Sequence, residues 1–132
     1  MSSVEAAKIN KKVVKITPKW DYIEQDYDIK YYKRYEKNFK VGKTDSLNVH
    51  YQSRNLKGLQ SRKKLAIFLY RTNNPFDGNP KHKLTKSTIY FKKTVNGRTV
   101  YSTKTFKNKY WIYYNPKNNF EPYKGVFYYT KK

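Results

Sequence analysis

The 132-residue chain contains no cysteine, only five glycines and five prolines, and only nine acidic residues. Without cysteine, a disulfide scaffold and a cysteine-ligated zinc or iron–sulfur site are excluded. The few glycines and prolines exclude a low-complexity segment built from them. No apolar run approaches the roughly 20 residues that a membrane-spanning helix needs. We therefore expect one folded domain without a membrane span, because the length leaves no room for two well-cored domains.

Basic residues are abundant, with 30 Lys or Arg against nine Asp or Glu and a formal net charge of +21. Such a charge repels itself in a compact monomer, and a bound polyanion relieves that repulsion. AT-rich codon usage explains why Lys outnumbers Arg but not why acidic residues are scarce. Residues 1–45 carry 11 basic and 7 acidic side chains, whereas residues 46–132 carry 19 and 2. The charge predicts a nucleic-acid partner that is bound mainly by the second part of the chain.

Aromatic residues make up 18% of the chain, and 15 of them are tyrosines. The mean hydropathy of −1.06 taken alone is typical of a disordered chain, but disordered chains are poor in aromatic residues. We therefore expect a folded protein with a core rich in Tyr and Phe and a strongly basic surface.

Residues 1–19 are predicted to form a basic N-terminal arm, followed by a single β-rich domain over residues 20–132. Within the arm, a weak capping box predicts a short helix over 4–12, and residues 11–16 resemble a short basic strand or extended segment that ends at Pro18. The alternative is a frayed terminus.

The N-terminus lacks the apolar core of a secretory signal peptide, because Lys8, Lys11 and Lys12 interrupt its first apolar stretch. We expect a virion or intracellular location.

Residues 20–41 fit two patterns. Aromatic and aliphatic residues recur at every fourth position from Ile23 to Phe39, as in a helix, but Tyr27, Ile29 and Tyr31 also alternate with charged residues, as in a strand. The tyrosine content favours one strand near 27–35 with irregular flanks. We expect its tyrosines to contact other subunits, with core packing as the alternative. These residues are Tyr27, Tyr31, Tyr32 and Tyr35.

Further strands are predicted wherever apolar residues alternate or form short runs. They cover 47–51, 65–70, 89–95, 98–103, 110–114 and 125–130, and residues 73–80 form a loop. About seven strands predict a mainly β fold, namely a small antiparallel sandwich or barrel. An eight-stranded jelly roll would need one more strand, its last, than this count provides.

Asn96-Gly97 lies between two β-rich runs and is the clearest hairpin signal, because a type I′ turn needs positive φ at both central residues. A two-residue turn pairs Thr94 with Thr99, Lys92 with Tyr101 and Tyr90 with Thr103. That face is polar, aromatic and cationic. The opposite face is predicted to join the core, apart from Lys93 near the turn; its apolar residues are Ile89, Phe91, Val95, Val100 and Phe106.

Three groups of residues are predicted to bind nucleic acid. Tyr90, Lys92 and Tyr101 offer aromatic stacking surfaces and a cation to a single strand, or phosphate contacts to a duplex. Two basic clusters offer phosphate contacts or a nuclear-import signal. They consist of Arg62, Lys63 and Lys64, and of Lys81, Lys83 and Lys86 beside His82. In each case the alternative is an ordinary solvated surface.

Catalytic motifs are missing from the sequence. The two histidines, His50 and His82, have no third metal ligand nearby, and there is no Gly-rich phosphate loop or Gly-x-Ser-x-Gly motif. Asp77 and His82 are the remaining nuclease-like pair, although Asp77 before Gly78 is more simply a turn residue. We expect no enzyme, no metal and no cofactor.

These observations favour a non-enzymatic structural protein of a nucleic-acid-containing particle, such as a virion or capsid component. It would bind nucleic acid without sequence preference and contact other subunits of the same particle. The alternatives are an RNA-binding protein of a ribosome-like assembly and a small nuclease.

Overall fold

The computed structural model describes residues 8–25, 28–54, 62–73, 79–117 and 119–132. These residues form nine strands and no helix, so the mainly β prediction is confirmed. The strands are β1 (Asn10–Lys15), β2 (Lys19–Gln25), β3 (Asp28–Val41), β4 (Asp45–Arg54), β5 (Arg62–Arg71), β6 (His82–Val95), β7 (Arg98–Lys107), β8 (Trp111–Tyr114) and β9 (Glu121–Lys131).

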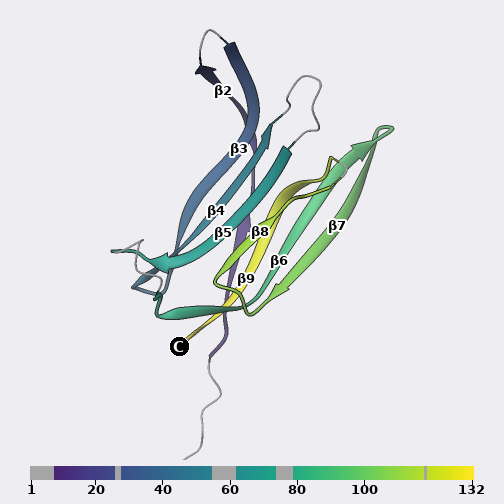
Figure 1. Ribbon diagram of the computed structural model, residues 1–132. Helices are drawn as coiled ribbons and strands as arrows, with labels where there is room; N and C mark the ends of the chain where they lie inside the picture. Colours follow the sequence, from purple (N-terminus) through teal and green to yellow (C-terminus); the bar gives the residue numbers. More distant parts are fainter. Residues whose placement is uncertain (1–7, 26–27, 55–61, 74–78, 118) are drawn as a thin grey trace, which may run out of the picture.

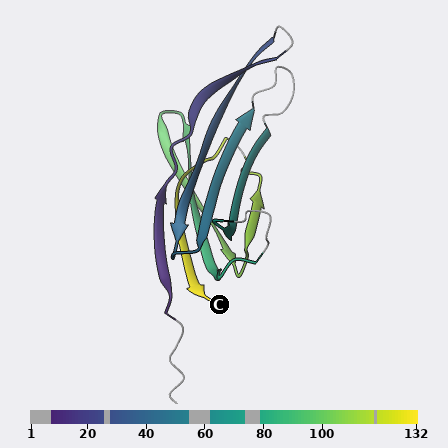
Figure 2. The same cartoon turned by 90° about the vertical axis from the view of Figure 1, so that its left-hand side faces the viewer.

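The strands build two antiparallel sheets (Figures 1 and 2). Sheet A has the order β1-β9-β6-β7, and sheet B has the order β2-β3-β4-β5-β8. Strands β2 to β5 follow one another as a meander, whereas β1 and β9 come from opposite ends of the chain and pair in sheet A. The β2–β3 hairpin projects at the upper end of both views. The chain is thus a sandwich of two sheets.

The N-terminal third of the chain differs most from the prediction. Residues 20–41 hold two paired strands, β2 and β3, rather than one strand with irregular flanks. Residues 10–12 belong to β1, so the helix predicted over 4–12 is wrong for these residues, while 1–7 lie outside the description. Val14 and Ile16 are buried in the common core, which explains why this segment is extended: alternate residues face inward.

The core lies between the sheets and follows the alternation of each strand. In β4 the buried residues Leu47, Val49 and Tyr51 alternate with more polar ones, and β5 contributes Leu65, Ile67 and Leu69. Burying each of these aliphatic side chains contributes about 1.5–3 kcal/mol. Sheet A adds Phe127, whose ring lies over Gly125; a Cβ at Gly125 would stand 2.7 Å from that ring. Glycine is therefore needed there to let the ring pack.

The predicted β6–β7 hairpin forms with the expected register. Thr94 pairs with Thr99, Lys92 with Tyr101 and Tyr90 with Thr103. Asn96 and Gly97 have φ of 51° and 75°, as a type I′ turn requires.

One part of the hairpin prediction is wrong. Ile89 and Phe91 are buried as expected, and Phe106 packs partly against the core, but Val95 and Val100 are 42% and 41% exposed. Both valines pair beside the turn, where they contribute little to the core. Alternation sets the side of the sheet that they face, but not whether the opposite sheet covers them.

Asp45 and His82 connect the two sheets, since Asp45 is the first residue of β4 in sheet B and His82 is the first residue of β6 in sheet A. The buried Asp45 Oδ2 accepts hydrogen bonds from the backbone N–H of His82 at 2.6 Å and from its ring Nδ1 at 2.8 Å. Burial alone would raise the pKa of Asp45, but the backbone hydrogen bonds of Lys81 and His82 and the His82 ring lower it overall. Asp45 therefore stays ionised inside the fold.

In the part of the chain that the structure describes, no helix could cross a membrane.

Candidate nucleic-acid interface

The solvent-facing side of sheet A gathers lysines and tyrosines from all four of its strands. Outward positions alternate with buried ones such as Ile89, Phe91 and Phe127, and a bulge at Thr85 keeps Lys86 in step with the rest of β6. We call this surface the lysine–tyrosine face. Its members are Lys11 and Lys15 of β1, Lys83, Lys86, Tyr90 and Lys92 of β6, Tyr101 of β7, and Tyr123, Lys124 and Tyr128 of β9.

Three tyrosines form the centre of the lysine–tyrosine face. The ring of Tyr123 lies 6.3 Å from that of Tyr90 and 5.9 Å from that of Tyr101. The planes are inclined by 58° and 68°, so the rings meet at an angle instead of stacking on one another. Tyr101 is 65% exposed.

Lysine ammonium groups lie over several of these rings. Lys92 Nζ is 5.5 Å from the centre of Tyr123, and Lys124 Nζ is 5.1 Å from the centre of Tyr90. Farther along the face, Lys86 Nζ is 4.6 Å from the centre of Tyr128. Such cation–π contacts favour these positions of the lysine ammonium groups over the tyrosine rings.

Acidic residues are nearly absent from sheet A. Its four strands contain one acidic residue, Glu121, at the start of β9. Glu121 forms an ion pair of 2.9 Å with Lys33 of β3, in the other sheet. The positive charge of the lysine–tyrosine face is therefore not neutralised by acidic residues of its own strands.

The structure brings together five of the residues predicted to bind nucleic acid. Lys83, Lys86, Tyr90, Lys92 and Tyr101 share the lysine–tyrosine face. Lys81 precedes β6 and is exposed, and its backbone carbonyl accepts a hydrogen bond from the Lys132 N–H at 2.9 Å.

The cluster of Arg62, Lys63 and Lys64 is divided by strand alternation. Lys63 is half-buried and donates to the Phe120 carbonyl at 3.2 Å, whereas Lys64 is exposed on sheet B over the ring of Tyr113. Burial lowers the pKa of Lys63, the charge of Glu121 opposes this shift, and Lys33 adds to it. For Arg62 the structure describes only its pairing with Arg54. Lys63 and Lys64 therefore do not form one cluster of exposed charges.

The tyrosines predicted to contact other subunits have partners within the chain where they are described. Tyr32 is buried, and the half-buried Tyr35 donates from its hydroxyl to the Lys15 carbonyl at 3.0 Å. Burial raises the pKa of the Tyr35 hydroxyl. Tyr31 is described only through its pairing with Tyr22, and Tyr27 lies outside the described residues.

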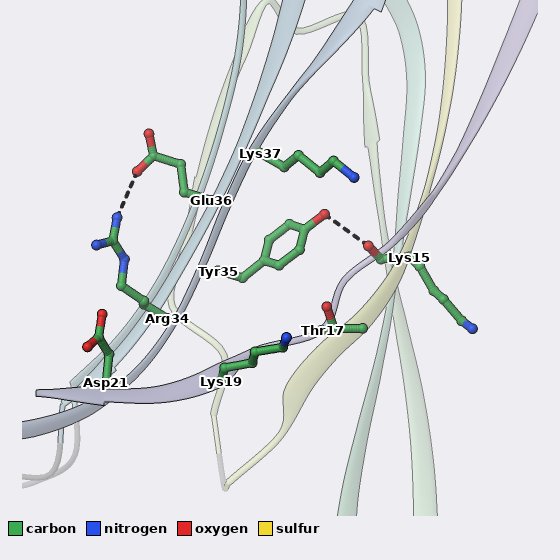
Figure 3. A pocket seen from close by; sticks show the side chains of 8 residues that line it. All are labelled: Lys15, Thr17, Lys19, Asp21, Arg34, Tyr35, Glu36 and Lys37. Atoms are coloured by element: carbon green, nitrogen blue, oxygen red, sulfur yellow. Dashed lines mark hydrogen bonds and ion pairs between the residues drawn. The ribbon is translucent and has the colours of Figure 1, made fainter.

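A groove of about 540 Å³ lies beside Tyr35, between the end of β1 and strands β2 and β3. Figure 3 shows Tyr35 between the side chains of Lys19 and Lys37, with Arg34 and Glu36 on the other side of β3. Arg34 pairs with Glu36 at 3.3 Å, and Asp21 also lines the groove. Its cations are thus partly neutralised, unlike those of the lysine–tyrosine face.

Sheet B carries an exposed aromatic patch that the sequence analysis did not identify as a surface. Trp111 and Tyr113 of the edge strand β8 are 59% and 51% exposed. Tyr113 meets Phe68 edge to face at 5.1 Å and Trp111 at 5.4 Å. In the sequence these residues form one apolar run, and the alternation that exposes Trp111 and Tyr113 while burying Ile112 is the signal that identifies them.

Five members of the lysine–tyrosine face were not predicted from the sequence. Tyr123, Lys124 and Tyr128 lie on β9, and alternation around the apolar Phe127 identifies Tyr128 as outward-facing. Lys11 and Lys15 reach the face because β1 pairs with β9, which joins opposite ends of the chain. That pairing leaves no local sequence signal.

The described residues contain no group of three or more His, Asp or Glu side chains placed to hold a metal ion. His82 bonds to Asp45 in the structure, while its predicted partner Asp77 lies outside the described residues. Comparisons of the chain with protein-family models, with curated proteins and with solved structures give no match.

Proposed function

We propose that this protein is a non-enzymatic structural protein of a nucleic-acid-containing particle, and that it binds nucleic acid through the lysine–tyrosine face. The observation that carries the proposal is the composition of sheet A. Four strands from distant parts of the chain place lysines and tyrosines on one surface, and their one acidic residue is paired with Lys33 of the other sheet. A cationic surface with aromatic residues between the cations suits a polyanion that also offers bases.

The binding is expected to be independent of sequence. Lysine is a point charge that attracts phosphate, whereas bidentate recognition of guanine is mainly the work of arginine. The named cations of the lysine–tyrosine face are all lysines. Contacts to the backbone position a protein on nucleic acid but carry no direct sequence information.

Titration of mixed-sequence oligonucleotides at several salt concentrations tests this proposal. Because several lysines replace condensed counterions, log affinity should fall linearly with log salt, by about 0.9 per duplex phosphate neutralised and about 0.7 per single-strand phosphate. Oligonucleotides of different sequence should give closely similar curves. Absence of binding at low salt, or an affinity that does not respond to salt, would contradict the proposal.

The contacts with other subunits are proposed to involve the aromatic patch of sheet B, namely Phe68, Trp111 and Tyr113. Large exposed aromatic side chains are enriched at protein interfaces, and this patch lies on the sheet opposite the lysine–tyrosine face. Such an arrangement leaves both surfaces free at once, as a particle component needs.

Light scattering of the same samples tests the assembly half of the proposal. A short oligonucleotide should relieve charge repulsion without covering the aromatic patch, so self-association should persist when nucleic acid is bound. Trp111→Ser should reduce it. A protein that stays monodisperse with and without oligonucleotide would refute the particle assignment while leaving nucleic-acid binding standing.

A further inference from the structure

We infer that the lysine–tyrosine face prefers single-stranded nucleic acid over a duplex and that Tyr101 is the residue on which a base stacks. This inference rests on the proposed function, since it specifies the form of nucleic acid that the same face binds. It follows from the arrangement of Tyr90, Tyr101 and Tyr123 together with Lys92 and Lys124.

Tyr101 presents the most accessible ring of the three. Lys92 and Lys124 place their ammonium groups over Tyr123 and Tyr90. Among the residues that the structure describes, no Lys or Arg lies over the Tyr101 ring. The 68° inclination between Tyr101 and Tyr123 brings an edge of one ring to the other, which leaves the ring of Tyr101 available to another partner.

The position of Tyr101 indicates that its side chain contributes little to the stability of the fold. It lies on the edge strand β7, in which every residue except Phe106 is exposed. A cross-strand pair such as Lys92 with Tyr101 contributes roughly 0.2–1 kcal/mol in general, which a threonine at this position also provides in part. An aromatic ring that is 65% exposed on a strand of threonines and lysines is better explained by an external partner.

A single strand can contact both the lysines and the Tyr101 ring, whereas a duplex can contact only the lysines. The bases of a single strand are free to stack on an aromatic ring while neighbouring phosphates meet lysine ammonium groups. In a duplex the bases are already stacked within the helix, so the lysines can bind its phosphates but the ring of Tyr101 has no base to receive. A difference between the two forms should therefore depend on Tyr101.

Fluorescence anisotropy with a short oligo(dT), a short oligo(U) and a mixed-sequence duplex of equal length tests the inference. Both single strands should bind the wild type more tightly than the duplex does. Tyr101→Thr should weaken single-strand binding roughly 5- to 150-fold, the loss expected for one stacked base, and leave duplex binding nearly unchanged. Tyr101→Phe should restore single-strand binding. Threonine keeps the strand propensity of β7, and melting curves check the fold.

Tyr22→Thr is the matched control, because Tyr22 is a strand tyrosine that is 62% exposed but lies on β2 of sheet B, outside the aromatic patch. It should leave all three affinities unchanged. Equal binding of single strand and duplex, or a Tyr101→Thr variant that binds both as the wild type does, would overturn the inference while the proposed function stands. If no oligonucleotide binds, the proposed function fails as well. Oligo(dT) and oligo(U) together show whether DNA or RNA is bound more tightly.

Discussion

The two sheets of this sandwich share a core but present different surfaces. The strands of sheet A contain one acidic residue, whereas those of sheet B contain five: Asp21, Glu24, Asp28, Glu36 and Asp45. The outer side of sheet A combines lysines with tyrosines, and the outer side of sheet B combines paired charges such as Arg34 and Glu36 with an aromatic patch at β8. Acidic residues are thus concentrated in sheet B, and we expect the polyanion on the outer side of sheet A and protein partners on the outer side of sheet B.

The order of residues along the chain does not show this difference between the sheets. The sequence divides into a nearly balanced part, residues 1–45, and a strongly basic part, residues 46–132. In the fold, β1 comes from the first part of the chain but belongs to sheet A, whereas β5 and all of β4 except Asp45 come from the second part but belong to sheet B. The sheets therefore combine residues from both parts of the chain.

The two sheets present different surfaces only while they keep a fixed arrangement, and removing the Asp45–His82 contact should have the largest effect on stability. Asp45→Asn replaces a buried carboxylate that accepts hydrogen bonds from the His82 backbone and ring, and we expect a loss of about 3 kcal/mol in the free energy of unfolding. Urea denaturation at neutral pH measures it. Glu36→Gln, which removes an exposed acidic residue of sheet B, is the control and should cost about 0–1 kcal/mol.

The same contact predicts a pH dependence. The pKa of Asp45 is lowered in the folded state from its ordinary value of 3.8, so its stabilising contribution is present above about pH 4. It is lost as the pH falls through the lower folded-state pKa. The difference in stability between wild type and Asp45→Asn should therefore shrink at acidic pH. A difference in stability that is the same at neutral and at acidic pH would show that the charge of the Asp45 carboxylate does not stabilise the contact between the sheets.

A smaller effect is expected at the turn that presents the lysine–tyrosine face. Gly97 has φ of 75°, and a Cβ there meets no atom within 4 Å, so Gly97→Val adds backbone strain without a steric clash. We expect a loss of about 1–3 kcal/mol. Lys92→Gln, on the same hairpin but exposed, should leave the melting temperature unchanged and weaken binding. If Gly97→Val melts at the same temperature as the wild type, glycine at this positive φ is not what stabilises the hairpin.

The local parts of the fold could be predicted from the sequence. The hairpin register follows from Asn96-Gly97, because a two-residue turn fixes every pair along both strands. The pairing of β1 with β9 and the presence of β2 as a separate strand could not be predicted, because both depend on which distant segments bury their apolar faces together. The same limit applies to the candidate site: Tyr90, Lys92 and Tyr101 are local to one hairpin, whereas Lys11, Lys15 and Tyr123 join them only through sheet A.

Two triple variants with equal loss of charge show whether nucleic acid binds to sheet A or to sheet B. One replaces Lys86, Lys92 and Lys124 by Gln. The other replaces three exposed lysines of the sheet B side by Gln, namely Lys40 of β3, Lys43 of the turn between β3 and β4, and Lys64 of β5. The measurement is the slope of log affinity against log salt for the same single strand. The first variant should lose up to about 0.7 from the slope for each lysine removed, and the second should match the wild type. Equal losses in both variants, or a larger loss in the second, would contradict the binding of nucleic acid to sheet A.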